Sequence, residues 1–397
     1  MLVRKAFKYR LRPTGPQTAK MRQMAGTTRF LWNSALALQK EHLRRRGKIL
    51  RYSEMCKELT AAKNTLGLEF LKETHSQVLQ QAVKALDRAL RDAFDKKQPN
   101  KRFPRFKKKG QHDSFRYPQG IKVDGRRVFL PKIGWVNFRK SRDIKGTIKN
   151  ATVSRRGAHW YVAIQTEQDI RVPIHPSRSM VGIDLGAKSY FAALSKGESI
   201  EPLSVFRNLE ANLAKEQRKL SRKKRFSNNW KKQKCRISRL HIRIADARRD
   251  FQHKTSTTIS KSHAVVVIED LKIANMSKSA KGTKEKPGKN VKAKSGLNKT
   301  ILDQGWYEFR RQLEYKQLWR GGQVVTVSAA YTSQMCSCCG HKASENRKSQ
   351  EDFLCLWCGH QEHADINAAK NIEAAGSAVL ACESNLVRDR KQEPLAA

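Results

Sequence analysis

Residues 179–186, Ser-Met-Val-Gly-Ile-Asp-Leu-Gly, predict a short buried strand with a carboxylate, Asp184, near its end and Gly186 just after it. An unpaired charge in apolar surroundings is costly, so an Asp in such a place usually binds a cation, caps a turn or takes part in chemistry. This stretch alone leaves a structural and a functional role for Asp184 equally open. Acids in comparable places further along the chain favour the functional role.

Two more carboxylates follow in compatible settings. The apolar, β-branched run 264–268 predicts a second buried strand, which ends in Glu269 and Asp270. We prefer Glu269 as the functional acid, because it comes first at the strand end and successive side chains of a strand point to opposite faces. The third acid, Asp365, opens a short helix, where a capping role is the simplest alternative.

The chain contains 8 cysteines, and a group of them precedes Asp365. Two Cys-x-x-Cys-Gly pairs, Cys336 with Cys339 and Cys355 with Cys358, are separated by 15 residues. Four thiolates at this spacing are typical of a structural zinc site, and in a reducing compartment such a cluster favours metal over disulfides. Alternative ligands remain open, and they are Cys338, His341, His360 and His363.

The order of these features indicates a nuclease core. The layout resembles that of an RNase H-like protein. One acid ends a strand, a second ends a later strand, and a third opens a helix behind a zinc ribbon. Mg²⁺ prefers near-octahedral oxygen coordination, and two ions about 4 Å apart need several converging carboxylates. We therefore expect Asp184, Glu269 and Asp365 to be both catalytic residues and Mg²⁺ ligands.

The composition indicates a polyanionic partner. The 397 residues include 82 Lys and Arg against 35 acids, a formal net charge of +47. Such an excess repels itself unless a polyanion neutralises it, so nucleic acid is the leading inference. A membrane partner is the weaker alternative, because no long apolar run exists and residues 1–13 lack the apolar core of a signal peptide. We therefore expect an intracellular protein.

The first half of the chain predicts a β-barrel interrupted by helices. An alternating strand at 3–12 precedes a capping box that starts at Thr14, and helical periodicity then extends over residues 14–97. Polar residues of this helical module such as Tyr52 and Gln80 are candidate DNA contacts, although for each one a solvated face is the favoured alternative. Short alternating strands between 128 and 164, separated by turns, would complete a small antiparallel barrel with the first strand.

The stretch 101–109 mixes basic and aromatic residues around Pro104. Its Arg105, Phe106 and Lys107 suit phosphate contact combined with stacking on bases or ribose. The two phenylalanines favour this interpretation over a solvated charge run.

The second half adds a long basic helix over about 230–262, whose apolar seam includes Ile237, Ile244 and Phe251. The Lys/Gly/Ser-rich stretch 276–299 predicts a mobile loop. A helix resumes at Ile301, and a strand follows at 323–328.

At the level of motifs, the chain resembles over nearly its whole length the TnpB-type proteins, transposon-encoded RNA-guided DNA nucleases of the OrfB family related to compact type V CRISPR effectors. The motifs that carry the resemblance are Phe7–Pro13, Pro104–Lys107, Gly182–Gly186, Ile268–Leu271, Thr332–Gln334 and Asp365–Ile372. The chain departs from the family's D-R-D-x-N pattern, because Ala364 and His363 precede Asp365. This departure removes two neighbours of Asp365 and leaves Asp365 itself.

The resemblance implies an α+β multidomain protein, with a wedge-like β-barrel that carries a helical recognition insertion and a RuvC-type, RNase H-like nuclease with an inserted zinc ribbon. The expected divisions are 1–13 with 98–168 for the barrel, 14–97 for the helical module, 169–330 with 363–376 for the nuclease, 331–362 for the ribbon and 377–397 for a tail. The loop at 276–299 would be a lid over the active site.

The resemblance also implies an Mg²⁺-dependent endonuclease that uses a transposon-derived guide RNA and cleaves double-stranded DNA beside a short flanking motif. We expect a monomer with its RNA in the cytoplasm of a prokaryotic cell, associated with the nucleoid. Two alternatives are a guide-directed DNA-binding regulator without cleavage and a protein-only DDE-type transposase. The presence of all three acids disfavours the first, and the zinc ribbon and the basic-aromatic barrel disfavour the second.

Overall fold

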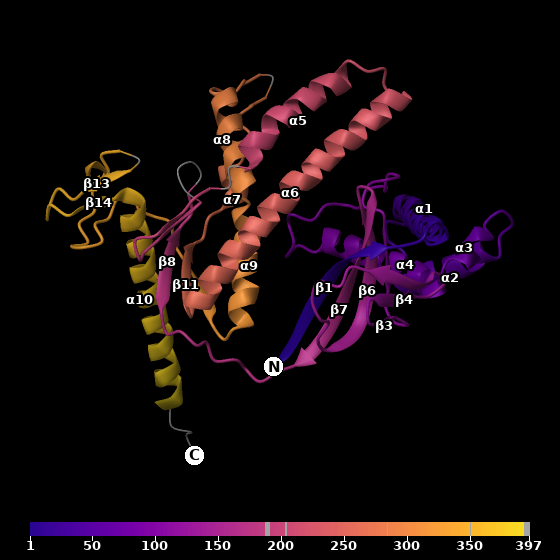
Figure 1. Cartoon of the computed structure of the whole chain (residues 1–397), viewed down its shortest axis with the longest axis horizontal. Helices are drawn as coiled ribbons and strands as arrows, with labels where there is room; N and C mark the ends of the chain where they lie inside the picture. Colours follow the sequence, from indigo (N-terminus) through magenta and orange to yellow (C-terminus); the bar gives the residue numbers. More distant parts are fainter. Residues whose placement is uncertain (187–190, 203–204, 284, 350, 393–397) are drawn as a thin grey trace. The chain divides into compact units, whose positions relative to one another are not determined.

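The chain forms two compact units, residues 1–171 and 172–397 (Figure 1). The structure is a computed structural model that describes residues 1–186, 191–202, 205–283, 285–349 and 351–392. Both units combine a β-sheet with helices, so the expectation of an α+β protein with more than one domain is confirmed at this level.

The first unit contains a seven-stranded antiparallel sheet in the order β2-β6-β7-β1-β5-β4-β3. Strand β1 is long enough to pair with β7 along most of its length and with β5 at Leu11 and Arg12, which joins the two halves of the sheet. The strands are β1 (Leu2–Arg12), β2 (Ser114–Tyr117), β3 (Lys122–Asp124), β4 (Arg127–Leu130), β5 (Gly134–Phe138), β6 (Thr147–Arg156) and β7 (His159–Asp169).

This sheet curves around one core, as the expected barrel would. Buried side chains from both halves, among them Phe115, Val128 and Trp160, belong to a single hydrophobic cluster. The two edge strands, β2 and β3, are consecutive in the chain and joined only by residues 118–121, so the edges must approach one another. No ladder pairs β2 with β3 in residues 1–171, all of which are described. Pro118 and the positive φ of Gly120 lie in this connection and are unsuited to continuing a ladder.

Four helices are inserted between β1 and β2. They are α1 (Gly15–Arg46), α2 (Tyr52–Lys63), α3 (Phe70–Glu73) and α4 (Ser76–Phe94). The expected capping box opens α1, where the Thr14 hydroxyl accepts from the Gln17 amide and the Gln17 side chain accepts from the Thr14 amide. The helices pack around their own cluster, which includes Leu36, Leu79 and Leu86.

The second unit is built on a five-stranded sheet in the order β10-β9-β8-β11-β12. Strands β8, β11 and β12 are parallel, and β9 is antiparallel to β8. The strands are β8 (Met180–Asp184), β9 (Ala192–Leu194), β10 (Ser199–Ile200), β11 (Val265–Glu269) and β12 (Gln323–Val327).

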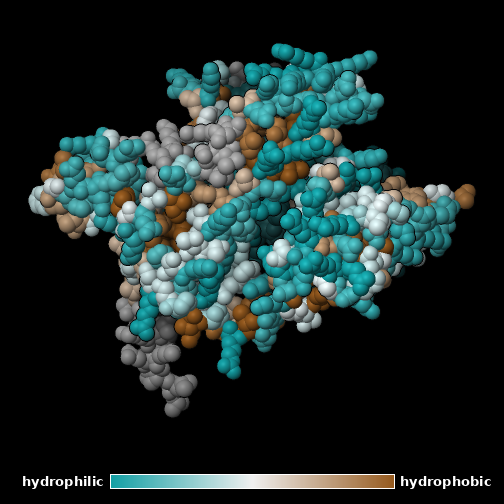
Figure 2. Space-filling view, in the orientation of Figure 1, coloured by the Kyte–Doolittle hydropathy of each residue, from teal (hydrophilic) through white to brown (hydrophobic). Residues whose placement is uncertain are grey.

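Helices cover both faces of this sheet, which explains why β8 and β11 are apolar without alternation (Figure 1). One face packs against residues of α6 and α9, such as Ile259 and Phe309, and the other packs against α10 at Ile372. The helices are α5 (Val205–Ser221), α6 (Asn228–Ser262), α7 (Ile273–Met276), α8 (Val291–Gln304), α9 (Trp306–Leu318) and α10 (Ala364–Gln392). Helices α5 and α6 form a hairpin whose far end is covered by hydrophilic side chains (Figure 2).

The second unit differs from the sequence expectations before α5 and in the stretch 276–299. The sequence suggests strands at 190–195 and near 202–206, whereas the structure has β9 at Ala192–Leu194 and β10 at Ser199–Ile200; residues 190, 203 and 204 lie outside those described. The stretch 276–299, described except for residue 284, contains the start of α8, whose Ile301 is buried and anchors the helix. Helix α10 continues past Gly376 to Gln392, so the described part of the expected tail is helical.

Strand β8 and helix α10 are in unusually close contact at Gly182. A Cβ atom on Gly182 would lie 2.1 Å from the Ala369 carbonyl oxygen and 2.6 Å from the Glu373 amide nitrogen. Both atoms belong to the backbone of α10 and cannot move aside cheaply. Glycine is therefore required here for the helix to seat on the sheet.

We predict that Gly182→Ala lowers the free energy of unfolding of the second unit by about 1–3 kcal/mol, the usual cost of overpacking a close contact. Urea unfolding would measure this. Gly296→Ala is the matched control, because Gly296 lies inside α8 with nothing within 4 Å of the added Cβ. The control should be neutral or slightly stabilising, and equal stability of the two variants would contradict the close-contact argument.

Candidate active site and cysteine metal centre

Asp184 and Glu269 lie side by side at the ends of neighbouring parallel strands. Asp184 is the last residue of β8 and Glu269 is the last residue of β11. The two strands pair in register up to Ile183 and Ile268, so the next residue of each strand is the carboxylate. The pairing of residues far apart in sequence thus brings two of the three expected acids to one edge of the sheet.

The environment of Glu269 disfavours its ionised form. Burial is the largest cause, and the negative charge of Asp184 adds to it, so that the pKa of Glu269 rises to about 7. The Thr332 hydroxyl donates a hydrogen bond of 2.7 Å to Oε1 of Glu269, which acts in the opposite direction. A cation between the two carboxylates would replace the proton and relieve this repulsion.

The neighbouring Asp270 faces other partners. Its Oδ1 accepts a hydrogen bond of 2.8 Å from Nη1 of Arg310, on helix α9. Asp270 is therefore neutralised by a protein cation, whereas Glu269 experiences the negative charge of Asp184. Strand alternation explains why the two neighbouring acids have different partners.

Asp365 lies in the first turn of α10 and is only 4% exposed. Nη2 of Arg347 donates to its Oδ1 at 3.3 Å, and Nδ1 of His363 lies 3.8 Å from its Oδ2. The arginine that the family pattern would place beside Asp365 is Ala364 in this chain, and Arg347, in the segment between the cysteine pairs, supplies a guanidinium instead. A simple capping role does not require such a partner.

The packing of α10 brings Asp365 to the same end of the sheet as Asp184. The helix is antiparallel to β8, because Ser377 hydrogen-bonds to Met180 while Ala369 lies against Gly182. Asp365 precedes Ala369 by one turn, about 6 Å along the helix. Asp184 follows Gly182 by two residues, about 7 Å along the strand. Asp184 and Asp365 therefore lie at similar positions along the direction of strand β8.

The three carboxylates are not gathered as tightly as metal ligands. Within the described part of the chain, the one group of His, Cys, Asp or Glu side chains found close enough to hold an ion is the cysteine quartet. Repulsion between Asp184 and Glu269, together with the ion pair of Asp365 and Arg347, is a physical reason for the looser arrangement.

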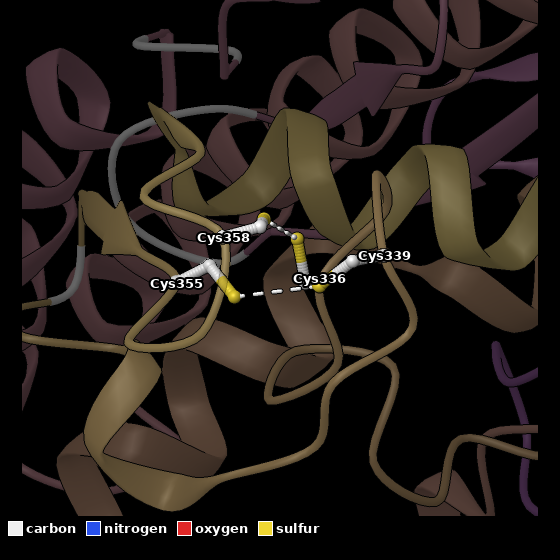
Figure 3. A group of neighbouring side chains, drawn as sticks. All are labelled: Cys336, Cys339, Cys355 and Cys358. Carbon is white, nitrogen blue, oxygen red and sulfur yellow. Dashed lines mark hydrogen bonds between the residues drawn. The ribbon is translucent and has the colours of Figure 1, made fainter.

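The four cysteines of the two Cys-x-x-Cys pairs converge on one point (Figure 3). Their sulfur atoms lie within 4.8 Å of one another, with Cys336 and Cys358 at 3.7 Å and Cys339 and Cys355 at 3.6 Å. Tetrahedral zinc with bonds of about 2.3 Å needs sulfur atoms about 3.8 Å apart, so the quartet fits such an ion. Cys338 and the three histidines are outside the group.

The two halves of the cysteine centre have matching turns. The Cys336 amide donates to the His341 carbonyl and the Gly340 amide to the Cys336 carbonyl, at 2.9 and 3.0 Å. The same two bonds recur from Cys355 to His360 and from Gly359 to Cys355. Gly340 and Gly359 have φ angles of 75° and 72°, which other residues rarely adopt.

Hydrogen bonds tie this ribbon to α10 beside the carboxylates. The Asn367 side chain bridges the Ser337 amide and the Met335 carbonyl. The side-chain amide of Asn371 donates to the backbone carbonyls of Thr332 and Met335. These bonds fix the segment that carries Thr332, the partner of Glu269. Thr332 and both asparagines belong to motifs in the sequence, but no role was expected for them. Arg347 was not anticipated, because a lone arginine in a basic chain is inconspicuous.

The candidate nucleic-acid contacts of the first unit lie in separate places. The stretch 105–107 is fastened to α1, because the Trp32 indole donates to the Arg105 carbonyl and the Asn33 side chain bonds the Lys107 backbone. The Lys107 ammonium lies 3.6 Å from the centre of the Trp32 ring, while the Phe106 ring is 49% exposed.

Tyr52 and Gln80 are on different helices. Tyr52 is half-buried at the start of α2, and burial raises its pKa to about 12. It lines a hollow of about 480 Å³ together with Asp87 and Arg91. Gln80 is exposed on α4.

None of the helices that the structure describes combines the length and apolar character that a membrane span requires.

Three family models match the chain. They are OrfB_IS605, described as "Probable transposase", over residues 161–280, the Cas12f1-like TNB domain over 306–372, and a helix-turn-helix domain of OrfB_IS605 over 1–48. The TNB match contains the cysteine quartet and Asp365.

Similar proteins match almost the whole chain. The "Putative RNA-guided DNA endonuclease InsQ" of Escherichia coli (strain K12) is 54% identical over 98% of this chain and 97% of its own length. A "Putative RNA-guided DNA endonuclease" of Streptomyces pristinaespiralis is 33% identical over 98% of this chain and 93% of its own length. Among solved structures, the cryo-EM structure of a Cas12f1-sgRNA-target DNA complex covers 94% of this chain and 99% of its own, with 18% identity and a TM-score of 0.35.

We predict that Glu269→Gln stabilises the protein at pH 8 in the absence of added divalent ions. The pKa of Glu269 is about 7 in the folded protein against an ordinary value of 4.5, so the folded state holds this proton more tightly. Its contribution to stability is therefore lost as pH rises from 4.5 to 7. At about 1.4 kcal/mol per pH unit, the variant should be more stable than the parent by about 3–4 kcal/mol at pH 8 and by little at pH 4.5.

Urea unfolding of parent and variant across this pH range would measure the difference. Added Mg²⁺ should reduce it by stabilising the parent only. If the free energies of unfolding of the two proteins changed with pH in parallel, the pKa of Glu269 would not be raised by folding.

Proposed function

The chain belongs to the family of TnpB-type RNA-guided DNA endonucleases, and we propose that it cleaves DNA beside a short flanking motif, directed by a transposon-derived guide RNA. The observation that carries the assignment of the cleavage site is the pair Asp184 and Glu269 at adjacent strand ends, with the pKa of Glu269 raised by burial and by Asp184. Two carboxylates held together at the cost of repulsion are suited to a divalent cation.

The proposed site has Asp184, Glu269 and Asp365 as catalytic residues and as ligands of Mg²⁺. Bound Mg²⁺ would supply an activated water and stabilise the leaving 3′ oxygen, and a pair of ions is the arrangement known for phosphodiester hydrolysis. Thr332 orients the Glu269 carboxylate, and Arg347 holds Asp365 in the first turn of α10. We further propose that the five-stranded sheet of the second unit is a RuvC-type, RNase H-like core and that the seven-stranded sheet is the wedge-like barrel.

We propose zinc as the ion of the cysteine quartet. The sulfur separations of 3.6 and 3.7 Å and the paired turns suit tetrahedral coordination by four thiolates. Its role would be structural, because all four positions are taken by protein ligands and the ribbon orients Thr332 and Arg347.

The charge of the chain supports guidance by RNA. A formal charge of +47 suits an A-form heteroduplex held through its backbone, while base pairing supplies the sequence specificity. A nuclease that acts on DNA in this way would work in the cytoplasm at the nucleoid. We retain a monomer with its RNA as the expected assembly.

We predict that Asp184→Asn abolishes Mg²⁺-dependent cleavage of a target plasmid and leaves guided DNA binding within about twofold. The substitution removes a charged ligand of the proposed site without changing the shape of the strand end. The control is Asp270→Asn, which removes the neighbouring acid that pairs with Arg310 and should keep most of the activity. Retained cleavage by Asp184→Asn would refute the site.

The same assay, after RNase treatment of the purified protein, separates the two remaining classes of function. A guided nuclease loses site-specific cleavage and recovers it when the RNA is restored. A protein-only transposase keeps its activity, and a binding-only regulator shows guided binding but no cleavage in any arm.

We predict about one zinc per chain in the purified protein and its loss in Cys355→Ser, with a clear fall in folded yield, because structural zinc contributes folding free energy. Cys338→Ser is the matched control and should keep its zinc, since Cys338 lies outside the quartet. Metal analysis by mass spectrometry and the yield of soluble protein would measure both effects. A Cys355→Ser protein that folds normally without zinc would contradict the structural role.

A further inference from the structure

The α5–α6 hairpin has its own small core. Leu213 of α5 packs with Ile237 and Ile244 of α6. Near the turn, the buried Gln233 side chain donates to the Glu216 carbonyl at 3.0 Å and to Glu216 Oε2 at 2.7 Å, which links the two helices. Residues at the turn are therefore held in place by the hairpin itself.

The end of this hairpin is strongly cationic. Between Glu216 and Asp246 the sequence has no acidic residue. The basic residues of this interval are Arg218, Lys219, Arg222, Lys223, Lys224, Arg225, Lys231, Lys232, Lys234, Arg236, Arg239 and Arg243. Hydrophilic side chains accordingly cover the far end of the hairpin in the space-filling view (Figure 2). Charges of one sign held this close together repel, and a polyanion relieves the repulsion.

Two aromatic rings lie within this cationic region. The Phe226 side chain is 64% exposed, and its ring centre lies 5.5 Å from that of Trp230. The Arg225 guanidinium lies 5.0 Å from the centre of the Phe226 ring, and the Lys234 ammonium lies 5.0 Å from that of Trp230. The two rings and their flanking cations form the hairpin tip, defined here as residues 222–234.

The backbone at Phe226 is disfavoured for its residue type. Its φ is 68°, in the left-handed region that glycine and asparagine tolerate far better than a phenylalanine. Asn228 and Asn229 follow two and three residues later, so the sequence offers better residues nearby but places Phe at the strained position. Within the fold the ring contacts Trp230 and the Arg225 guanidinium, yet most of its surface stays exposed, so a disfavoured backbone holds an aromatic face that is open to a partner.

We propose that the hairpin tip is a stacking site for unpaired bases of a single-stranded nucleic acid, with its Lys and Arg side chains on the flanking phosphates. Aromatic faces interleaved with cations are suited to this ligand, because every unpaired base offers a flat ring and every nucleotide a phosphate. Paired bases already stack on one another inside a duplex and leave no face for Phe226. The proposal rests on the proposed function only in assuming that nucleic acid is the partner.

A photocrosslinking experiment locates the contact on the full-length protein. Twelve-nucleotide dT and U oligomers with 5-iodouracil at the centre would be irradiated with the protein, and the crosslinked peptide identified by mass spectrometry. We expect crosslinks within residues 226–230, and their relative yield with the two oligomers tells whether DNA or RNA is preferred. Crosslinks confined to other parts of the chain would overturn the proposal.

Two variants separate stacking from charge. Phe226→Gly combined with Trp230→Leu should weaken binding of the oligomer at least about fivefold at every salt concentration, since stacking is worth about 1–3 kcal/mol per base. The Tm of the double variant, measured beside its binding, should stay close to that of the parent, because Phe226→Gly also relieves the positive φ, and this excludes unfolding as the cause. Lys224→Gln should instead reduce the dependence of log K on log salt by about 0.7.

Two outcomes would refute this site, and neither depends on the cleavage chemistry. Unchanged affinity and unchanged crosslinks in the ring variant would show that the rings do not stack on bases. Loss of binding to vesicles containing anionic lipid, with oligomer binding intact, would assign the tip to a membrane surface. Asp184→Asn should leave the crosslink unchanged, so a failed active-site assignment and a failed tip assignment give different results.

Discussion

The close contact of helix α10 with strand β8 at Gly182 is the constraint on which the second unit depends. Because glycine has no Cβ, the backbone of α10 can lie directly against the strand at Ala369 and Glu373. This contact fixes the position of α10 along β8, and therefore the position of Asp365 relative to Asp184. It also positions Asn367 and Asn371, which hold the cysteine ribbon. A bulkier residue at one position of one strand would disturb the acid site and the ribbon together.

The proposed site and the cysteine ribbon are physically coupled. Thr332 precedes the first cysteine and donates to Glu269, and Arg347, between the two cysteine pairs, donates to Asp365. The four sulfur atoms organise the segment that carries these two donors. The ribbon is thus more than a separate stabilising module, since it presents a neutral donor to one acid and a positive charge to another.

Local sequence patterns were sufficient for several features because they depend on neighbours in the chain. The Thr14 and Gln17 capping box, the cysteine spacing with its two glycines and the apolar runs of β8 and β11 all appear in the structure as expected. The α5 helix and the start of α8 were not anticipated. Both are rich in Lys and polar residues, and packing of a few side chains such as Leu213 and Ile301 decides that they are helical.

Local patterns in the chain are enough to place the chemistry-bearing residues: two acids at strand ends, one at a helix start and four cysteines in two turns. Composition alone determined the cationic character. Only the tertiary structure decided that β8 and β11 are parallel neighbours in register, that Asp270 turns to Arg310, and that Thr332 and Arg347 serve the acids. The physical reason is range: spacing and periodicity are encoded between adjacent residues, whereas a hydroxyl or guanidinium acquires its partner only when distant segments pack together.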